Sequence, residues 1–314
     1  MPKTLPKRLE GIVKRYEGNP IITRKDISFA VSKILNAGSI KHKNKYLLLL
    51  RAQTMDTRSY LVKATSKDGI NFNISKRYTI SPSREFKLDD RGVEDPRITK
   101  IDGTYYIAHT AYSDDGAVIG IISTKDFRKF ARHGIATPPE NKDGGLLPEK
   151  IKLPRSGDKE FFLYHRPSAT GAIWCCSSPD LEHWGHQHVV MRRGQYNRWS
   201  DKKVGLGAVP IKTEKGWLEI YHGVMEEGNN NVYRLGAALF DLEEPWKVIR
   251  ASKSYILAPE EEYEMMGGVS YVVFSCGVVP ESNGDVKIYY GAADSSICLA
   301  TAKLDELIEV AEKY

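Results

Sequence analysis

The chain of 314 residues is 41% hydrophobic and 27% charged, a composition typical of soluble globular proteins rather than of disordered ones. Its length exceeds the usual single domain, but all-β folds of this size often form one unit. The net charge of +6 is mild and spread along the sequence, without a basic helix or an RNA-binding aromatic motif, so nucleic acid is not expected as a partner.

The N-terminal segment and the cysteines bear on location. Residues 1–8 lack the apolar core of a signal peptide, and no window approaches the roughly 20 apolar residues of a membrane span. Cys175, Cys176, Cys276 and Cys298 show no metal-site spacing, and we interpret them as reduced core residues. We therefore expect a cytoplasmic protein with no membrane partner.

Five similar units follow one another along the sequence. Each has an apolar strand-like segment, then a second one, and then a turn that contains an aspartate. These aspartates recur at intervals of roughly 60 residues, and a regular period indicates a repeat architecture. They are Asp68, Asp126, Asp180, Asp241 and Asp305.

Each unit offers short strands joined by turns, as in a propeller blade of about four strands. We therefore predict an all-β fold in which residues 1–314 form a single five-bladed β-propeller, with residues 1–18 as an N-terminal extension. Apolar residues recur at helical spacing over Leu304–Lys313, which predicts a short C-terminal helix.

The first apolar segment of each unit is interpreted as the innermost strand of its blade. Such strands aim their ends at one central cavity, and the loops there carry functional side chains. Charged or polar residues border every one of these segments, which predicts a lined pocket. The segments are 45–51, 104–108, 160–164, 216–221 and 286–291, and the bordering residues include Asn36, Arg51, Arg58, Asp95, Arg166, His222 and Asp294.

The densest acid-base cluster is the hexapeptide Gly-Val-Glu-Asp-Pro-Arg at 92–97, which follows Arg91. A proline excludes the residue before it from the α region, so we expect Asp95 at a rigid junction between a loop and the next strand. A surface network of ion pairs involving Arg91 and Arg97 is the alternative interpretation, because structural ion pairs also perturb pKa values.

Four motifs, taken in order, resemble glycoside hydrolase family 130, the β-mannoside phosphorylases. They are Gly-Val-Glu-Asp-Pro-Arg at 92–97, Asn-Lys-Asp-Gly-Gly-Leu-Leu-Pro-Glu-Lys at 141–150, His-Arg-Pro at 165–167 and Tyr-His-Gly at 221–223. The resemblance spans roughly Asn19 to Asp305. It implies a five-bladed propeller that cleaves a β-mannosidic bond with inorganic phosphate as co-substrate and no other cofactor, releasing α-mannose 1-phosphate.

The resemblance also implies roles for individual residues. Asp95 is similar to the proton donor of the family. The residues that match mannose-binding positions are Asn36, Arg51, Arg58 and Asp294, and those that match phosphate-binding positions are Lys142, Arg166, Lys203 and His222, with Tyr233 beside them.

The chemistry of these residue types points in the same direction. An inverting hydrolase needs two carboxyls, one as the acid and one as the base for water, whereas phosphate brings its own negative charge and attacks unaided. One acid with a basic cluster is therefore typical of a phosphorylase. Arg166 can hold two phosphate oxygens, Lys203 supplies a point charge, and His222 can donate a hydrogen bond when it is suitably protonated.

Two other functions stay open at this stage. The first is an inverting β-mannosidase on the same propeller, with Glu226, Glu227 or another acid as the second carboxyl. The second is a propeller that only binds glycans or proteins. Tyr112, Tyr196 and Trp199 could line the acceptor side in any of these cases, because sugar rings stack on aromatic faces. A metal site at His183, His186 and His188 is disfavoured because no cysteine ligands accompany them, so no metal is expected.

Several of the proposed residues also have structural interpretations. Arg51 and Arg58 could be exposed blade charges, Lys203 a loop charge and His222 a core histidine. The linkage, β-1,4 or β-1,2, and the acceptor sugar are left open. The segment before Asn19 is a candidate contact with a second subunit, so a homo-oligomer is possible.

Overall fold

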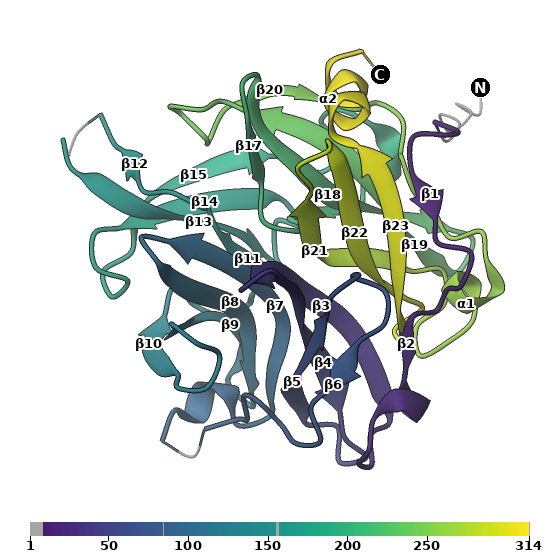
Figure 1. The fold of residues 1–314 in the computed structure, drawn as a ribbon. Coiled ribbons are helices and arrows are strands. Elements are labelled where there is room, and N and C mark those ends of the chain that lie inside the picture. Colours follow the sequence, from purple (N-terminus) through teal and green to yellow (C-terminus); the bar gives the residue numbers. More distant parts are fainter. Residues whose placement is uncertain (1–8, 84, 155–156, 314) are drawn as a thin grey trace.

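The computed structural model describes residues 9–83, 85–154 and 157–313, and most of these residues lie in β-strands or the turns between them (Figure 1). The all-β prediction is confirmed. Within the described residues the strands form four sheets, in which neighbouring strands are antiparallel almost throughout. No helix in this part of the chain is long and apolar enough to cross a membrane.

The largest sheet has eight strands and divides into two antiparallel halves. A parallel pairing of Ser59 with Gly92 joins the halves. The first half is β3 (Lys33–His42), β4 (Lys45–Gln53), β5 (Ser59–Ser66) and β6 (Asn73–Ile74). The second half is β7 (Gly92–Ile101), β8 (Thr104–Ser113), β9 (Gly116–Thr124) and β10 (Ala131–Ile135).

The next two sheets are built from consecutive stretches of the chain. One contains β11 (Asn141–Leu146), β12 (Ile151–Lys152), β13 (Lys159–Pro167), β14 (Ile173–Ser178) and β15 (Gly185–Met191). The other contains β16 (Lys203–Gly205), β17 (Ile211–Thr213), β18 (Gly216–Glu227), β19 (Asn230–Phe240) and β20 (Val248–Ala251). In the described part of the chain, three short 3₁₀ helices lie between strands, at Arg24–Asp26, Lys87–Asp89 and Arg198–Ser200.

The last sheet joins the two ends of the chain. Its C-terminal strands are β21 (Val273–Pro280), β22 (Asp285–Ala292) and β23 (Ser296–Lys303). Two N-terminal strands, β1 (Lys14–Arg15) and β2 (Ile22–Thr23), both pair with β23. The structure thus places Lys14 and Arg15 in a sheet, although residues 1–18 are predicted to be an extension. Residues 1–8 of that segment lie outside the described residues.

The strand predicted to be innermost in each unit instead pairs with the strand that opens its group. These predicted strands are β4, β8, β13, β18 and β22, and the opening strands are β3, β7, β11, β16 and β21. The strands that open the groups contact one another between groups: β3 contacts β7 and β21, and β7 contacts β11. Figure 1 shows these strands toward the middle of the molecule. Their sequences escape a search for apolar runs because β3, β7, β11 and β21 each contain a register shift, and β16 has only three residues.

The four consecutive leucines of β4 show how the groups pack. Side chains alternate between the two faces of a strand. Leu48 and Leu50 therefore join the apolar cluster shared with β22 and β23, whereas Leu47 and Leu49 join the cluster shared with β7 and β8. A strand covered on both faces reads as a continuous apolar run, as this one does.

The turn aspartates explain the repeat in the sequence. In the first four copies the carboxylate accepts hydrogen bonds from backbone N–H groups two and three residues ahead, at distances of 2.8–3.1 Å. Such bonds fix a tight turn directly after β5, β9, β14 and β19. Asp305 differs because it lies in the first turn of a helix.

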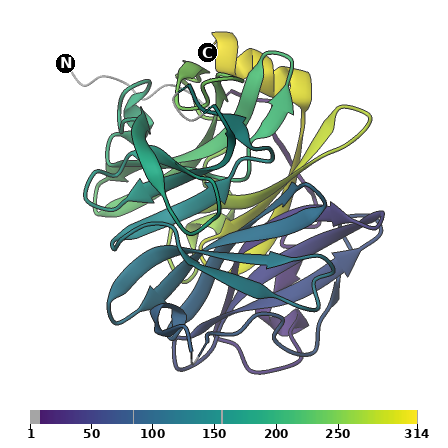
Figure 2. The same ribbon diagram turned by 90° about the vertical axis from the view of Figure 1, so that its left-hand side faces the viewer.

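The predicted C-terminal helix is confirmed as α2 (Leu304–Lys313). It buries Leu307, Ile308, Val310 and Ala311 and contacts β19, β20 and β23, so it covers one edge of the sheets (Figure 2). A second, short helix, α1 (Glu262–Met265), lies before β21. All four cysteines fall within the described ranges and are buried free thiols, as expected.

Candidate active site

A cavity of about 200 Å³ brings together every predicted site residue except Arg58. Its walls come from five strand groups, namely the two halves of the largest sheet and the three other sheets, so residues far apart in sequence meet there. The lining residues are Asn36, Arg51, Asp95, Lys142, Asp143, Arg166, Lys203, His222, Tyr233, Val269, Val272, Phe274 and Asp294.

Bulges in the opening strands supply three of these side chains. Asn36, Asp95 and Asp143 have φ angles of 43°, 48° and 57°, and each lies at a register shift of its strand. A bulge inserts an extra residue and redirects its side chain. Asp95 therefore lies inside β7, and its expected place at a junction between loop and strand is wrong. Pro96 is accommodated because the bulge interrupts the ladder at that point.

Asp95 occupies the acidic side of the cavity. Its Oδ1 accepts hydrogen bonds from Arg51 Nη1 at 2.9 Å and from Asn36 Nδ2 at 2.8 Å. Burial raises the pKa of Asp95, but the Arg51 charge and these hydrogen bonds outweigh burial and hold the pKa below the ordinary carboxyl value. The carboxyl is therefore ionised near neutral pH.

Two further carboxyls flank Asp95. Glu94 is buried, accepts from Arg51 Nη2 at 2.5 Å and from Ser59 Oγ at 2.9 Å, and fixes the guanidinium between two acids. Asp294 follows β22 with a φ of 49° and lines the cavity. Burial and the neighbouring Asp95 charge raise the pKa of Asp294 above its ordinary value.

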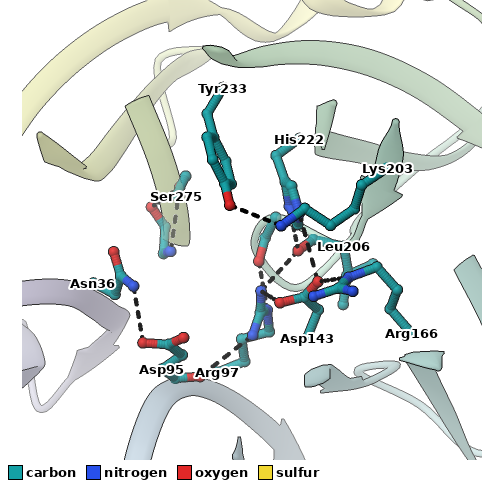
Figure 3. Close-up of polar contacts among 12 residues, drawn as sticks. Asn36, Asp95, Arg97, Asp143, Arg166, Lys203, Leu206, His222, Tyr233 and Ser275 are labelled. Atoms are coloured by element: carbon teal, nitrogen blue, oxygen red, sulfur yellow. Dashed lines mark hydrogen bonds and ion pairs between the residues drawn. The ribbon is translucent and has the colours of Figure 1, made fainter. Parts of the chain in front are cut away.

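The basic side of the cavity faces Asn36 and Asp95 across open space (Figure 3). Arg166 Nε donates to Asp143 Oδ2, and Lys203 Nζ donates to the Tyr233 hydroxyl at 2.7 Å. Burial and, to a smaller extent, the nearby Arg166 charge lower the pKa of Lys203 to about 8. These side chains hold positive charge in a partly closed space.

The family assignment rests on the whole chain as well as on this cavity. The family model described as beta-1,4-mannooligosaccharide phosphorylase matches residues 7–313. The chain belongs to glycoside hydrolase family 130.

Curated members of family 130 resemble this chain along most of its length. A beta-1,2-mannobiose phosphorylase of Listeria innocua is 39% identical over 81% of this chain and 69% of its own. A 1,2-beta-oligomannan phosphorylase of Thermoanaerobacter is 36% identical over 94% and 98%. A beta-1,4-mannooligosaccharide phosphorylase of Ruminococcus albus is 30% identical over 98% and 93%.

The fold agrees with a solved structure of the family. The beta-1,2-mannobiose phosphorylase of Listeria innocua in complex with beta-1,2-mannobiose superposes with a TM-score of 0.84 at 32% identity. The superposition covers 96% of this chain and 99% of the other. The likeness therefore extends through every strand group that lines the cavity.

In this family-130 chain, a buried arginine links the acidic and basic sides of the cavity. The sequence alone did not indicate it as a residue of the site. Arg97 is fully buried and donates from Nε to Gly207 O at 2.5 Å and from Nη2 to Leu206 O at 2.7 Å. The Leu206 carbonyl also accepts from His222 Nδ1 at 3.2 Å. The Leu206–Gly207 segment thus aligns an arginine of β7 with the histidine of β18.

Asp143 is the other residue of the site that sequence reasoning missed. It lies in the motif at 141–150, in which the resemblance indicates only its basic neighbour Lys142 as a phosphate-binding residue. A Cβ at position 205 would lie 2.4 Å from Asp143 Oδ2 and from the His222 ring, so glycine at 205 makes this contact possible. Gly205 is the sequence signal that could have indicated this contact, because a glycine within a strand often marks a place where another group approaches the backbone closely.

Several candidates lie away from the cavity. The Arg58 side chain is 47% exposed and pairs with Asp56 at 3.2 Å, so its role in binding mannose stays a prediction. Glu226 pairs with Lys202 and Glu227 with Arg234, at 2.6 Å and 2.5 Å.

The aromatic residues that were candidates for the acceptor side lie in different surroundings. Trp199 is fully buried and stacks on Tyr221, so its expected place on the acceptor side is wrong. Its 3₁₀ helix packs against β18, and the ring fills the core between glycines at 223 and 236. Tyr112 is exposed, and its ring lies 5.9 Å from Lys142 Nζ at the rim.

Proposed function

We propose that this chain is a β-mannoside phosphorylase that transfers a mannosyl group from a β-mannoside to inorganic phosphate. The products are α-mannose 1-phosphate and the shortened acceptor, and the reaction is reversible. The observation that carries the proposal is the pairing of Asp95 with a cluster of cations, Lys142, Arg166 and Lys203, across one cavity. An acid and an anion site face each other there, as phosphorolysis requires.

The reaction follows from this arrangement. Phosphate held by Arg166 and Lys203 attacks the anomeric carbon of the mannosyl group on the face opposite the leaving oxygen. The new bond joins a phosphate oxygen to the anomeric carbon, the glycosidic bond breaks, and the configuration inverts from β to α. Asp95 delivers the proton that the departing acceptor oxygen needs, either directly or, as the family resemblance implies, through the 3-hydroxyl of the mannose.

Three groups near Asp95 are suited to hold the mannose. Asn36 donates to Asp95 through Nδ2, while its Oδ1 has no hydrogen-bond partner among the described residues and can accept from a sugar hydroxyl. Arg51 and Asp294 offer a donor and an acceptor beside it. Hydrogen-bonding groups of both kinds fit the hydroxyls of one sugar ring.

Asp95 needs a proton before it can act as an acid, and the substrates help to supply it. The carboxyl is ionised near neutral pH because the Arg51 charge lowers its pKa. Phosphate brings negative charge into the same cavity, and a nearby like charge raises a carboxyl pKa. We therefore infer that Asp95 takes up a proton when phosphate and the mannoside are both bound.

The five strand groups are proposed to form a five-bladed propeller. The active-site cavity is lined from all five groups. A second cavity of about 350 Å³ is also lined by residues of β3, β7, β17 and β21 and by Pro148, which follows β11. Two cavities that are both bordered by β3, β7 and β21 support closure around an axis. The buried free thiols favour a cytoplasmic location.

The linkage is proposed to be β-1,2. Of the relatives described above, the two named for β-1,2 linkages are 39% and 36% identical to this chain, and the one named for β-1,4 is 30% identical. A rate comparison on β-1,2-, β-1,3- and β-1,4-mannobiose, each with and without phosphate, tests both the linkage and the reaction. Cleavage of β-1,2-mannobiose that depends on phosphate is expected, and cleavage of no mannobiose would overturn the proposal.

The hydrolase alternative is addressed by the same comparison. It requires a carboxyl that activates water opposite Asp95. Glu226 and Glu227 were the candidates, and both pair with cations away from the cavity. The remaining carboxyl on the basic side, Asp143, is tied to Arg166. This arrangement favours phosphate over water as the nucleophile.

A further inference from the structure

Two hydrogen-bond acceptors stand among the cations of the proposed phosphate site. Asp143 Oδ2 accepts from Arg166 Nε and lies 3.5 Å from His222 Nε2, while Asp143 Oδ1 lies 3.9 Å from Arg97 Nη2. Both Asp143 and His222 line the cavity. A site built only to attract negative charge would contain donors alone, so a carboxylate among them needs another explanation.

The second acceptor is the free nitrogen of His222. A carbonyl oxygen only accepts, so the 3.2 Å contact between His222 Nδ1 and Leu206 O assigns the ring proton to Nδ1. A neutral imidazole has one N–H, which leaves a lone pair on Nε2. Burial lowers the pKa of His222 to about 3, so the ring is neutral near pH 7. Nε2 is buried and has no hydrogen-bond partner among the described residues.

We propose that His222 Nε2, with Asp143 beside it, accepts a hydrogen bond from the remaining O–H of hydrogen phosphate, so that the site selects oxyanions that still carry a proton. The inference rests on the proposed function. Hydrogen phosphate has one O–H and three further oxygens. Arg166, Lys203 and Lys142 bind the oxygens that only accept, and the O–H donates to Nε2. No covalent bond changes in this binding step.

Sulfate is the discriminating probe. It has the shape and charge of hydrogen phosphate, but it carries no proton near neutral pH. One sulfate oxygen would therefore face the His222 lone pair and the Asp143 carboxylate, with no hydrogen to share. Arsenate keeps one proton under these conditions, although it is slightly larger, so it separates the effect of the proton from that of size.

The test compares inorganic phosphate, arsenate and sulfate by calorimetry on the intact chain near neutral pH, at constant ionic strength. Sulfate is expected to bind about ten- to a hundredfold more weakly than phosphate, because it forfeits one hydrogen bond to a buried polar group. Arsenate should bind within a few-fold of phosphate. Equal affinities for sulfate and phosphate would overturn the inference while leaving the proposed function intact.

Two variants test which residue causes the weaker binding of sulfate. Asp143→Asn places an amide donor where the carboxylate stood, so the affinity for sulfate should come closer to the affinity for phosphate. Lys203→Met should weaken both anions and leave that ratio unchanged. The wild-type ratio decides the matter even if Asp143→Asn fails to fold. Absence of phosphate binding by the wild type would overturn the proposed function and this inference together.

Discussion

Asp95 is the group whose removal should affect turnover most. Asp95→Asn keeps the size of the side chain but cannot give a proton to the leaving oxygen, so kcat should fall by about 10²–10⁴-fold. Asp285→Asn is a matched control, because Asp285 lies at the start of β22 and pairs with the exposed Lys303. Steady-state rates with melting curves distinguish lost chemistry from lost folding. A variant of Asp95 as active as the Asp285 control would contradict the assignment.

Lys203 makes phosphate binding depend on pH. Its pKa is lowered to about 8, first by burial and then by the Arg166 charge. Below this pH the ammonium is charged and holds phosphate, and above it the charge is lost. The KM for phosphate should therefore rise above about pH 8, whereas kcat should change less because bound phosphate stabilises the ammonium.

Its neighbour Lys202 provides the control for that profile. Lys202 is exposed and pairs with Glu226, so Lys202→Ala should retain the rise in KM. Lys203→Met should bind phosphate more weakly throughout and lose the rise. An unchanged profile in Lys203→Met would show that another group titrates.

The residues of the site were predictable from sequence to different degrees. Arg166 and His222 were found because each follows an apolar run within a family motif. Arg97 and Asp143 were missed, because their roles depend on contacts with segments more than 20 positions away in the sequence. A charged residue buried by such contacts looks like any surface charge when only its sequence neighbours are considered.

At the scale of elements, the segment between β16 and β17 controls both sides of the cavity. A Cβ at position 207 would lie 1.9 Å from Ile220 O, and Gly207 N–H donates to the buried Glu219 at 2.8 Å. Gly207→Ala should cost about 1–3 kcal/mol of unfolding free energy, as overpacking does. It should also raise the KM for phosphate, because Leu206 positions His222.

Gly185 is the matched glycine. A Cβ there meets no atom within 4 Å, and its backbone has an ordinary φ. Gly185→Ala should stay within about 0.5 kcal/mol of the wild type. Thermal or urea unfolding of both variants measures the difference, and equal stability of the two would refute the close approach at 207.

The elements themselves were predicted unevenly. In each group, the strand that pairs with the opening strand was recognised because it is covered on both faces and is continuously apolar, as β4 is. The opening strands were assigned to loops or to motifs, because bulges at Asn36, Asp95 and Asp143 break their alternation. The features that make them functional also hide them from a search for regular patterns.

At the scale of the whole molecule, the N-terminal strands complete the last sheet. Ile22 in β2 is 1% exposed, pairs with Ile297 of β23 and belongs to the core beneath β4. Ile22→Ala should lower the unfolding free energy by about 2–5 kcal/mol, as expected for a large-to-small change in a core. Lys25→Ala, three positions further on at an exposed site, should have little effect. A negligible loss in Ile22→Ala would mean that the N-terminal segment is dispensable.

The all-β class and the succession of similar strand groups could be predicted because the period of the turn aspartates and the apolar runs are local features. The pairing of the N-terminal strands with the C-terminal sheet could not be predicted, because β1 and β2 pair with β23, which lies near the far end of the chain. Nothing in the short sequences of β1 and β2 specifies that partner. The pairing is determined by which sheet has a free edge when the other groups are in place.

The phosphate dependence of β-mannoside cleavage tests the central claim most directly. The measurement is the initial rate of β-1,2-mannobiose cleavage against phosphate concentration, with α-mannose 1-phosphate followed by phosphorus NMR and free mannose assayed in parallel. A rate that rises from near zero to a plateau, with α-mannose 1-phosphate as the main product, is predicted. Release of free mannose at the same rate in phosphate-free buffer would contradict the account and favour hydrolysis.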